Sequence, residues 1–212
     1  MNADIFLKQR LICVAVIDNA GDAVPLTEAL LAGGLQAIEV TFRTAGAADA
    51  IARIRQALPK AVVGAGTLLT ADQVKQAVDA GAQFGVSPGL SKVVSKAALE
   101  NKFPLFPGVI TPTEVMAALE LGWKHLKFFP AETFGGVHAL KALSGPFGHT
   151  GAKFIPTGGI TAGNLPNYLA IPQVAAIGGS WMADRKLIAE KSWGKITALT
   201  SEAMKVIATA NA

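Results

Sequence analysis

The sequence contains one cysteine and three histidines in 212 residues. Cys13 has no partner for an internal disulfide and lies in an apolar, strand-like run, so we interpret it as a packed thiol rather than a nucleophile. The histidines, His125, His138 and His149, show no pairing at the spacing of metal ligands. This scarcity argues against redox chemistry, and we expect no metal and no cofactor.

Long hydrophobic runs and blocks of charge are also missing. The apolar run 11–17 is too short to span a bilayer and is followed at once by Asp18 and Asn19. The first ten residues lack the features of a secretory signal. The net charge is +4, but the basic residues are scattered along the chain. We therefore expect a cytoplasmic protein that binds neither membranes nor nucleic acid, and whose mild positive charge suits small anionic metabolites.

Short apolar runs rich in Val, Ile and Phe alternate with longer stretches of helical period, which is typical of parallel strands connected by helices. The predicted strands are 12–17, 37–40, 61–64, 84–86, 104–106, 125–128, 153–156 and 175–177. The predicted helices include 22–32, 47–58, 71–80, 92–101, 112–120, 137–143 and 162–169. The pattern predicts an α/β fold with eight strands, each followed by a helix.

Eight such units in this length match a compact (β/α)8, or TIM, barrel. An open doubly wound sheet is the alternative, but the G-x-G-x-x-G fingerprint of dinucleotide-binding folds is absent. No linker or low-complexity segment interrupts the pattern, so we expect a single domain over residues 1–212. Residues 3–10 are predicted to form a short N-terminal helix that closes the bottom of the barrel.

Reacting groups in a barrel lie at the carboxyl ends of the strands, so polar residues that close apolar strands are candidates for catalysis. Lys127 ends the sixth predicted strand between apolar neighbours, and strand alternation directs it into the barrel. Desolvation there disfavours the ammonium form and leaves an amine able to attack a ketone. Glu39 ends the second strand in the same way, so a carboxylate and an amine are predicted to meet as an acid/base pair.

The loops contain further candidates for substrate binding. Arg43, in the loop after the second strand, has the fork geometry that suits a substrate carboxylate. Two glycine clusters, PTGGI at 156–160 and IGGS at 177–180, close the seventh and eighth strands. Barrels bind phosphate there, because bare glycine backbone lets N–H groups approach the oxygens. A Ser-His-Asp site is not supported, since the G-x-S-x-G motif is absent.

Six motifs occur in the order in which one known family carries them. They are EVTFRT at 39–44, GAGT at 64–67, SPG at 87–89, KFFPAE at 127–132, PTGGI at 156–160 and IGGSW at 177–181. The chain closely resembles the 2-keto-3-deoxy-6-phosphogluconate (KDPG) and 4-hydroxy-2-ketoglutarate (KHG) aldolase family over residues 13–181. The resemblance implies a homotrimeric, metal-independent class I aldolase that releases pyruvate and glyceraldehyde 3-phosphate from KDPG in the Entner-Doudoroff pathway.

The resemblance also implies a role for each matching residue. Lys127 is expected to form the Schiff base, and Glu39 to act as the general acid and base. The expected binding residues are Arg43 and Thr67 for the pyruvate carboxylate, Pro88 and Phe129 as pocket walls, and Thr157, Gly158, Gly159, Gly178, Gly179 and Ser180 around the phosphate.

Three alternatives remain open. A galactonate-type or KHG-cleaving member of the family would share the same lysine and glutamate. The residue at position 157, a threonine, resembles that of the gluconate-type members. A decarboxylase, epimerase or thiamine-phosphate synthase would keep the glycine clusters without an imine. An inactive barrel would only bind a sugar phosphate.

Overall fold

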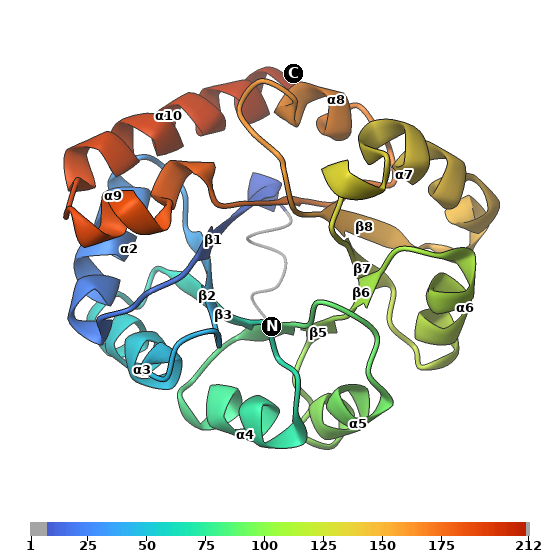
Figure 1. The fold of residues 1–212 in the computed structure, drawn as a ribbon, viewed down its shortest axis with the longest axis horizontal. Helices are drawn as coiled ribbons and strands as arrows, with labels where there is room; N and C mark the ends of the chain where they lie inside the picture. The colour runs from blue at the N-terminus through green and yellow to red at the C-terminus, as the bar shows by residue number, and fades with distance from the viewer. Residues whose placement is uncertain (1–7, 211–212) are drawn as a thin grey trace.

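The structure, a computed structural model, describes residues 8–210 (Figure 1). Its strands are β1 (Leu11–Ala15), β2 (Ala37–Thr41), β3 (Val62–Gly66), β4 (Phe84–Val86), β5 (Leu105–Phe106), β6 (Gly108–Val109), β7 (His125–Phe128), β8 (Lys153–Pro156) and β9 (Ile177–Gly179). Its α-helices are α2 (Ala23–Ala32), α3 (Ala47–Ala57), α4 (Ala71–Asp79), α5 (Lys92–Glu100), α6 (Pro112–Glu120), α7 (Gly136–Ser144), α8 (Leu165–Leu169), α9 (Arg185–Ala189) and α10 (Trp193–Ala210). Short 3-10 helices are η1 (Ala20–Asp22), η2 (Glu132–Phe134), η3 (Gly145–Thr150) and η4 (Trp181–Ala183).

The strands form two parallel sheets with the helices outside them (Figure 1). One sheet has six strands in the order β5-β4-β3-β2-β1-β9, and the other has three in the order β6-β7-β8. The prediction of a closed eight-stranded (β/α)8 barrel is therefore wrong: the described residues form an α/β fold with nine strands in two sheets. The predicted alternation of strands and helices is present, but continuous pairing around the ring is not.

Proline and glycine account for the two breaks between the sheets. Pro107 separates β5, which lies within the predicted fifth strand and pairs with β4, from β6, which was not predicted and pairs with β7. Proline has no N–H to donate to a ladder, so pairing does not run through it. At the other break, β8 and β9 are joined only by isolated bridges such as Thr157–Gly178. There the positive φ values of Gly158 and Gly159, +102° and +76°, turn the chain out of the strand.

Most element boundaries lie within one or two residues of the predicted ones. Thr70 caps α4 by accepting from Gln73 N, and Thr111 and Glu114 form a capping box at the start of α6. Burial by itself raises the pKa of the Glu114 carboxyl group, but hydrogen bonds from Ile110 and Thr111 outweigh burial and lower it. Helix α9 was not predicted, and the helix predicted over residues 3–10 lies largely outside the described residues.

The strands are buried on both faces, as expected for parallel strands covered by helices. All five residues of β1, β2 and β3 are buried. The Cys13 side chain is 0 % exposed, and burial, followed by the charge of Glu39, raises the pKa of its thiol, so the prediction of a packed thiol is confirmed. Within residues 8–210, no helix has the length and apolar character needed to cross a membrane.

Candidate active site

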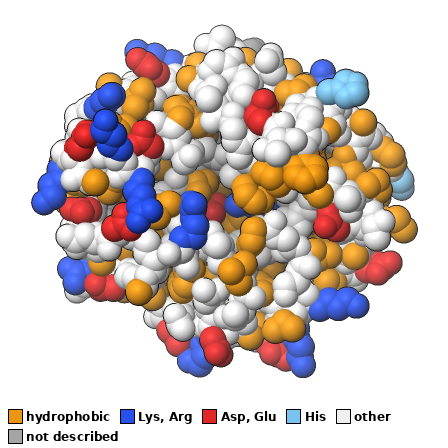
Figure 2. Space-filling view, viewed as in Figure 1, with side chains coloured by type: hydrophobic (Ala, Val, Ile, Leu, Met, Phe, Trp, Pro, Cys, Tyr) orange, Lys and Arg blue, Asp and Glu red, His pale blue; other side chains and the backbone are white. Residues whose placement is uncertain are grey.

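A cavity of about 290 Å³ lies at the carboxyl ends of the strands. It is lined by Val14, Glu39, Thr41, Arg43, Thr67, Pro88, Lys127, Phe129, Thr157, Gly158, Gly159, Ile160, Gly178, Gly179 and Ser180. The structure thus brings all the site residues predicted from the sequence to one cavity, although six loops and both sheets contribute them. In Figure 2, acidic and basic side-chain atoms are both visible in the depression near the centre of this face.

Lys127 and Glu39 meet at the floor of the cavity. Lys127 lies on β7 and Glu39 on β2, so the pair spans the two sheets. The Lys127 Nζ atom is 3.8 Å from Glu39 Oε1, and the two residues are 5 % and 3 % exposed. The same Nζ lies 4.8 Å from the centre of the Phe129 ring. Burial therefore excludes most water from the amine and the carboxyl group, which face each other across this short distance.

The space for the Glu39 carboxylate depends on Gly66, the last residue of the neighbouring strand β3. A Cβ atom added to Gly66 would lie 2.0 Å from Glu39 Oε1 and 2.7 Å from its carboxyl carbon. Glu39 Oε1 is also buried without a hydrogen-bond partner, apart from the ion pair with Lys127. An unsatisfied buried acceptor is rare in proteins and is typical of a site where a reacting group binds.

Thr67 follows Gly66 and has a φ of +58°. This left-handed conformation is unusual for a β-branched residue and is disfavoured by about 1 kcal/mol or more. Thr67 also lines the cavity, together with Glu39 and Lys127, and residues with strained backbone are often found at functional sites.

The two glycine clusters form the opposite wall of the cavity. A Cβ atom on Gly178 would lie 2.3 Å from Thr157 Oγ1, and one on Gly179 would lie 1.8 Å from the Trp181 ring. Neighbouring side chains therefore leave no room for a Cβ atom at either position, and bare glycine backbone lines this part of the cavity. Such bare backbone is suited to an anion that accepts hydrogen bonds from N–H groups.

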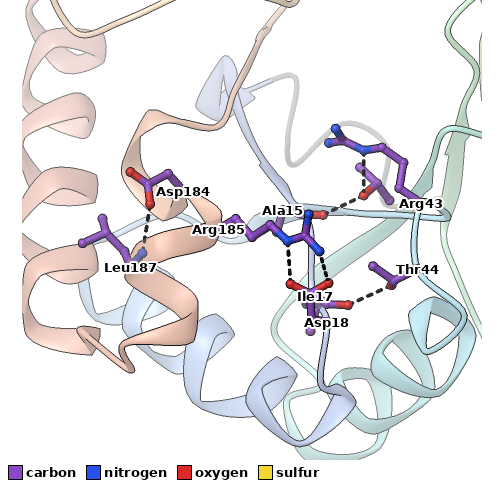
Figure 3. A network of polar contacts seen from close by, with 9 residues as sticks. Ala15, Ile17, Asp18, Arg43, Thr44, Asp184, Arg185 and Leu187 are labelled. Atoms are coloured by element: carbon purple, nitrogen blue, oxygen red, sulfur yellow. Dashed lines mark hydrogen bonds and ion pairs between the residues drawn. The ribbon is translucent and has the colours of Figure 1, made fainter.

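Polar contacts connect the loops at the rim (Figure 3). Arg43 Nε donates to Thr41 Oγ1 at 3.3 Å, and Thr41 Oγ1 donates to the Ala15 carbonyl at 3.1 Å. Asp18 accepts from Nε and Nη2 of Arg185, both at 2.6 Å. The hydrogen bond from Arg185 lowers the pKa of Asp18, and its positive charge adds to the effect. These contacts tie the loops that follow β1, β2 and β9.

Three lining residues were not predicted: Val14, Thr41 and Ile160. Thr41 lies two residues after Glu39 on β2 and points to the same side, so strand alternation was a signal for it. Val14 and Ile160 are apolar and resemble core residues in the sequence. Among the described residues, no three His, Cys, Asp or Glu side chains come together in a group that could hold a metal ion.

The chain is similar to proteins of one family. The family model for KDPG and KHG aldolase matches residues 3–199. The 2-dehydro-3-deoxy-phosphogluconate aldolase of Treponema pallidum is 46% identical over 198 residues, 93% of each chain. A crystal structure of KDPG aldolase from Legionella pneumophila, with pyruvate captured as a covalent carbinolamine intermediate, has a TM-score of 0.88 and 42% identity over 93% of this chain and 95% of that one.

A second solved structure is similar to the same extent. It is the 2-keto-3-deoxy-6-phosphogluconate aldolase of Zymomonas mobilis with 3-phosphoglycerate, with a TM-score of 0.85 and 44% identity over 95% of this chain and 94% of that one. The two structures hold, respectively, pyruvate and a three-carbon acid phosphate.

Proposed function

This chain belongs to the KDPG and KHG aldolase family, and on that premise we propose that Lys127 and Glu39 perform its chemistry. The enzyme is a class I aldolase, a lyase that cleaves KDPG to pyruvate and glyceraldehyde 3-phosphate. The observation that carries the residue assignment is the buried Lys127–Glu39 pair, with 3.8 Å between Nζ and Oε1, at the floor of the cavity.

Schiff-base formation follows from this geometry. Transfer of a proton from Lys127 to Glu39 gives an amine that can act as a nucleophile and a carboxyl group that can act as an acid. The amine attacks C2 of the substrate ketone and forms a carbinolamine. Glu39 then protonates the departing hydroxyl group, and loss of water gives a protonated imine.

Carbon–carbon bond cleavage uses the iminium as an electron sink. Glu39, directly or through a water, removes the proton from the C4 hydroxyl group. The C3–C4 bond breaks, its electrons move into the enamine, and C4 leaves as the aldehyde of glyceraldehyde 3-phosphate. Protonation of the enamine at C3 and hydrolysis of the imine release pyruvate and return Lys127 to its free form.

The other lining residues fit the two ends of the substrate. Arg43 and Thr67 lie on the side of Glu39 and are suited to the carboxylate at C1. Pro88 and Phe129 are suited to be apolar walls around the reacting carbons. Gly158, Gly159, Gly178, Gly179 and Ser180, together with Thr157, would hold the phosphate through backbone N–H groups and hydroxyls.

A second substrate and an assembly are part of the same proposal. KHG carries the same pyruvate-forming carbons as KDPG, and the family model is named for both activities, so we expect KHG cleavage as well. We also propose a homotrimer, as the resemblance implies, in the cytoplasm. Comparing turnover of the two C4 epimers would separate the gluconate-type substrate from the galactonate type.

Borohydride trapping tests the assignment of Lys127. Reduction in the presence of pyruvate should attach a three-carbon unit to Lys127, detectable by peptide mass spectrometry, and inactivate the enzyme. An unmodified Lys127 under turnover conditions would refute the assignment. It would favour a phosphate-binding enzyme that uses no imine, such as a decarboxylase or an epimerase. A Lys127→Met variant that binds ligand normally, together with an unmodified protein without turnover, would favour an inactive binding protein.

A further inference from the structure

Behind the glycine wall of the cavity, a partly buried hydrogen bond joins the segments that follow β7 and β8. Glu132 begins η2, and Tyr168 lies on α8. Tyr168 is 0 % exposed, and its hydroxyl group donates to Glu132 Oε1. Burial and then the hydrogen bond to Glu132 raise the pKa of Tyr168, so the hydroxyl remains a donor at neutral pH. The pair has no part in the chemistry described above.

The stem of Glu132 packs against the cavity wall from outside. A Cβ atom on Gly159 would lie 2.7 Å from Glu132 Cβ, so the glycine is needed for this approach. A Cβ atom on Gly136 would lie 2.9 Å from Glu132 Oε1 and 3.2 Å from the Tyr168 hydroxyl oxygen. Gly159 lines the cavity, whereas Glu132 is not among the described lining residues. The carboxylate is thus held on the far side of the glycine wall.

Backbone hydrogen bonds from the same turn orient the peptides of that wall. Ala131 N donates to the Thr157 carbonyl at 2.9 Å, and Glu132 N donates to the Gly158 carbonyl at 3.1 Å. In a trans peptide the N–H points opposite to the C=O. The N–H groups of Gly158 and Gly159 are therefore turned away from η2, as a phosphate bound in the cavity would require.

We propose that Tyr168 and Glu132 are a positioning pair that fixes the Gly158–Gly159 peptides for the substrate phosphate and so determines the preference for phosphorylated keto acids. The inference rests on the proposed function of the cavity. Without the hydrogen bond between Tyr168 and Glu132, η2 is no longer anchored to α8 and no longer holds the two peptides in one orientation.

The test compares a reaction that uses the phosphate with one that does not. Tyr168→Phe removes only the hydroxyl group. We expect KM for KDPG to rise about tenfold, which is the effect expected when one hydrogen bond to a charged group is lost. The value of kcat should change less than about twofold. Exchange of the pyruvate methyl protons with solvent deuterium, which needs Lys127 and Glu39 but no phosphate, should keep its wild-type rate.

Three further variants separate positioning from folding. Glu132→Gln keeps an acceptor for Tyr168 and should keep KM for KDPG at the wild-type value. Glu132→Ala, at an exposed residue, should raise KM for KDPG as Tyr168→Phe does. Thr200→Val is the matched control, because Thr200 is 0 % exposed and its hydroxyl donates to the Ile196 carbonyl at 2.7 Å on α10. It should not alter KM for KDPG.

The outcomes are distinguishable. An unchanged KM for KDPG in both Tyr168→Phe and Glu132→Ala overturns the inference. Equal losses in KDPG cleavage and pyruvate exchange also overturn it, since they indicate a general structural role. Absence of pyruvate exchange in the unmodified enzyme overturns the proposed function itself, and this inference with it.

Discussion

Gly66→Ala should damage catalysis by displacing a carboxylate. The added Cβ would lie 2.0 Å from Glu39 Oε1, while real Cβ contacts are essentially never under 3.0 Å, so the oxygen must move by about 1 Å. Misplacement of a catalytic group by this distance costs roughly 100-fold in rate. We therefore expect kcat for KDPG to fall about 100-fold, while overpacking destabilises the protein by about 1–3 kcal/mol.

The assay is steady-state turnover coupled to detection of pyruvate, with folding checked by urea denaturation. Gly194→Ala is the control, because a Cβ there meets no atom within 4 Å and Gly194 lies on helix α10. It should keep full activity. Glu39→Asp shortens the side chain and withdraws the carboxylate, so its effect should be smaller in the Gly66→Ala background than in the wild type. If the losses in kcat of the two single variants simply multiply in the double variant, the proposed contact between the added Cβ and Glu39 is refuted.

Three other variants test separate parts of the structure. Lys127→Met should abolish trapping of pyruvate and, by leaving Glu39 buried without a cation, lower the free energy of unfolding by about 3 kcal/mol in urea titrations. Thr67→Asn, which tolerates the left-handed conformation, should stabilise the protein by about 1 kcal/mol and reduce kcat/KM severalfold, and a fall in stability would contradict the strain argument. Glu114→Ala should cost about 1 kcal/mol at pH 7. Because the pKa of Glu114 is lowered on folding, its contribution is complete above the unfolded value of about 4.3 and is lost as the pH falls through the folded value, so wild type and variant should converge in acid.

Strands and helices were predicted at the right positions where the sequence signals act over a few residues. The strand containing Lys127 and the helix capped by Thr111 both lie at the predicted positions. Apolar alternation and capping act over a few residues, and each can be recognised without knowledge of the rest of the chain. The meeting of Glu39 with Lys127 was predictable only because strand ends collect at one edge of a parallel fold.

Whether the strands pair continuously around the ring was not predictable in the same way, because this depends on pairing between strands that are distant in the sequence. Pro107 was visible in the sequence, but the predicted fifth strand ended at residue 106, and the short strand β6 that follows the proline and pairs with a different neighbour was not predicted. The Tyr168–Glu132 bond was missed for a related reason. Its partners are separated by 36 residues and give no periodic signal.

The division into two sheets bears directly on catalysis. Glu39 and Gly66 belong to the six-stranded sheet, while Lys127 belongs to the three-stranded sheet, so the distance between carboxylate and amine depends on how the sheets meet. Pro107 lies at one junction, and its carbonyl accepts from Lys127 N at 2.9 Å, which ties the backbone of the lysine to that junction. The Thr157–Gly178 bridge joins the sheets at the glycine clusters. The two junctions therefore set the distances between the Lys127 amine, the Glu39 carboxylate and the glycine wall. Substitutions at the junctions should alter kcat more than substitutions of equally buried residues within either sheet.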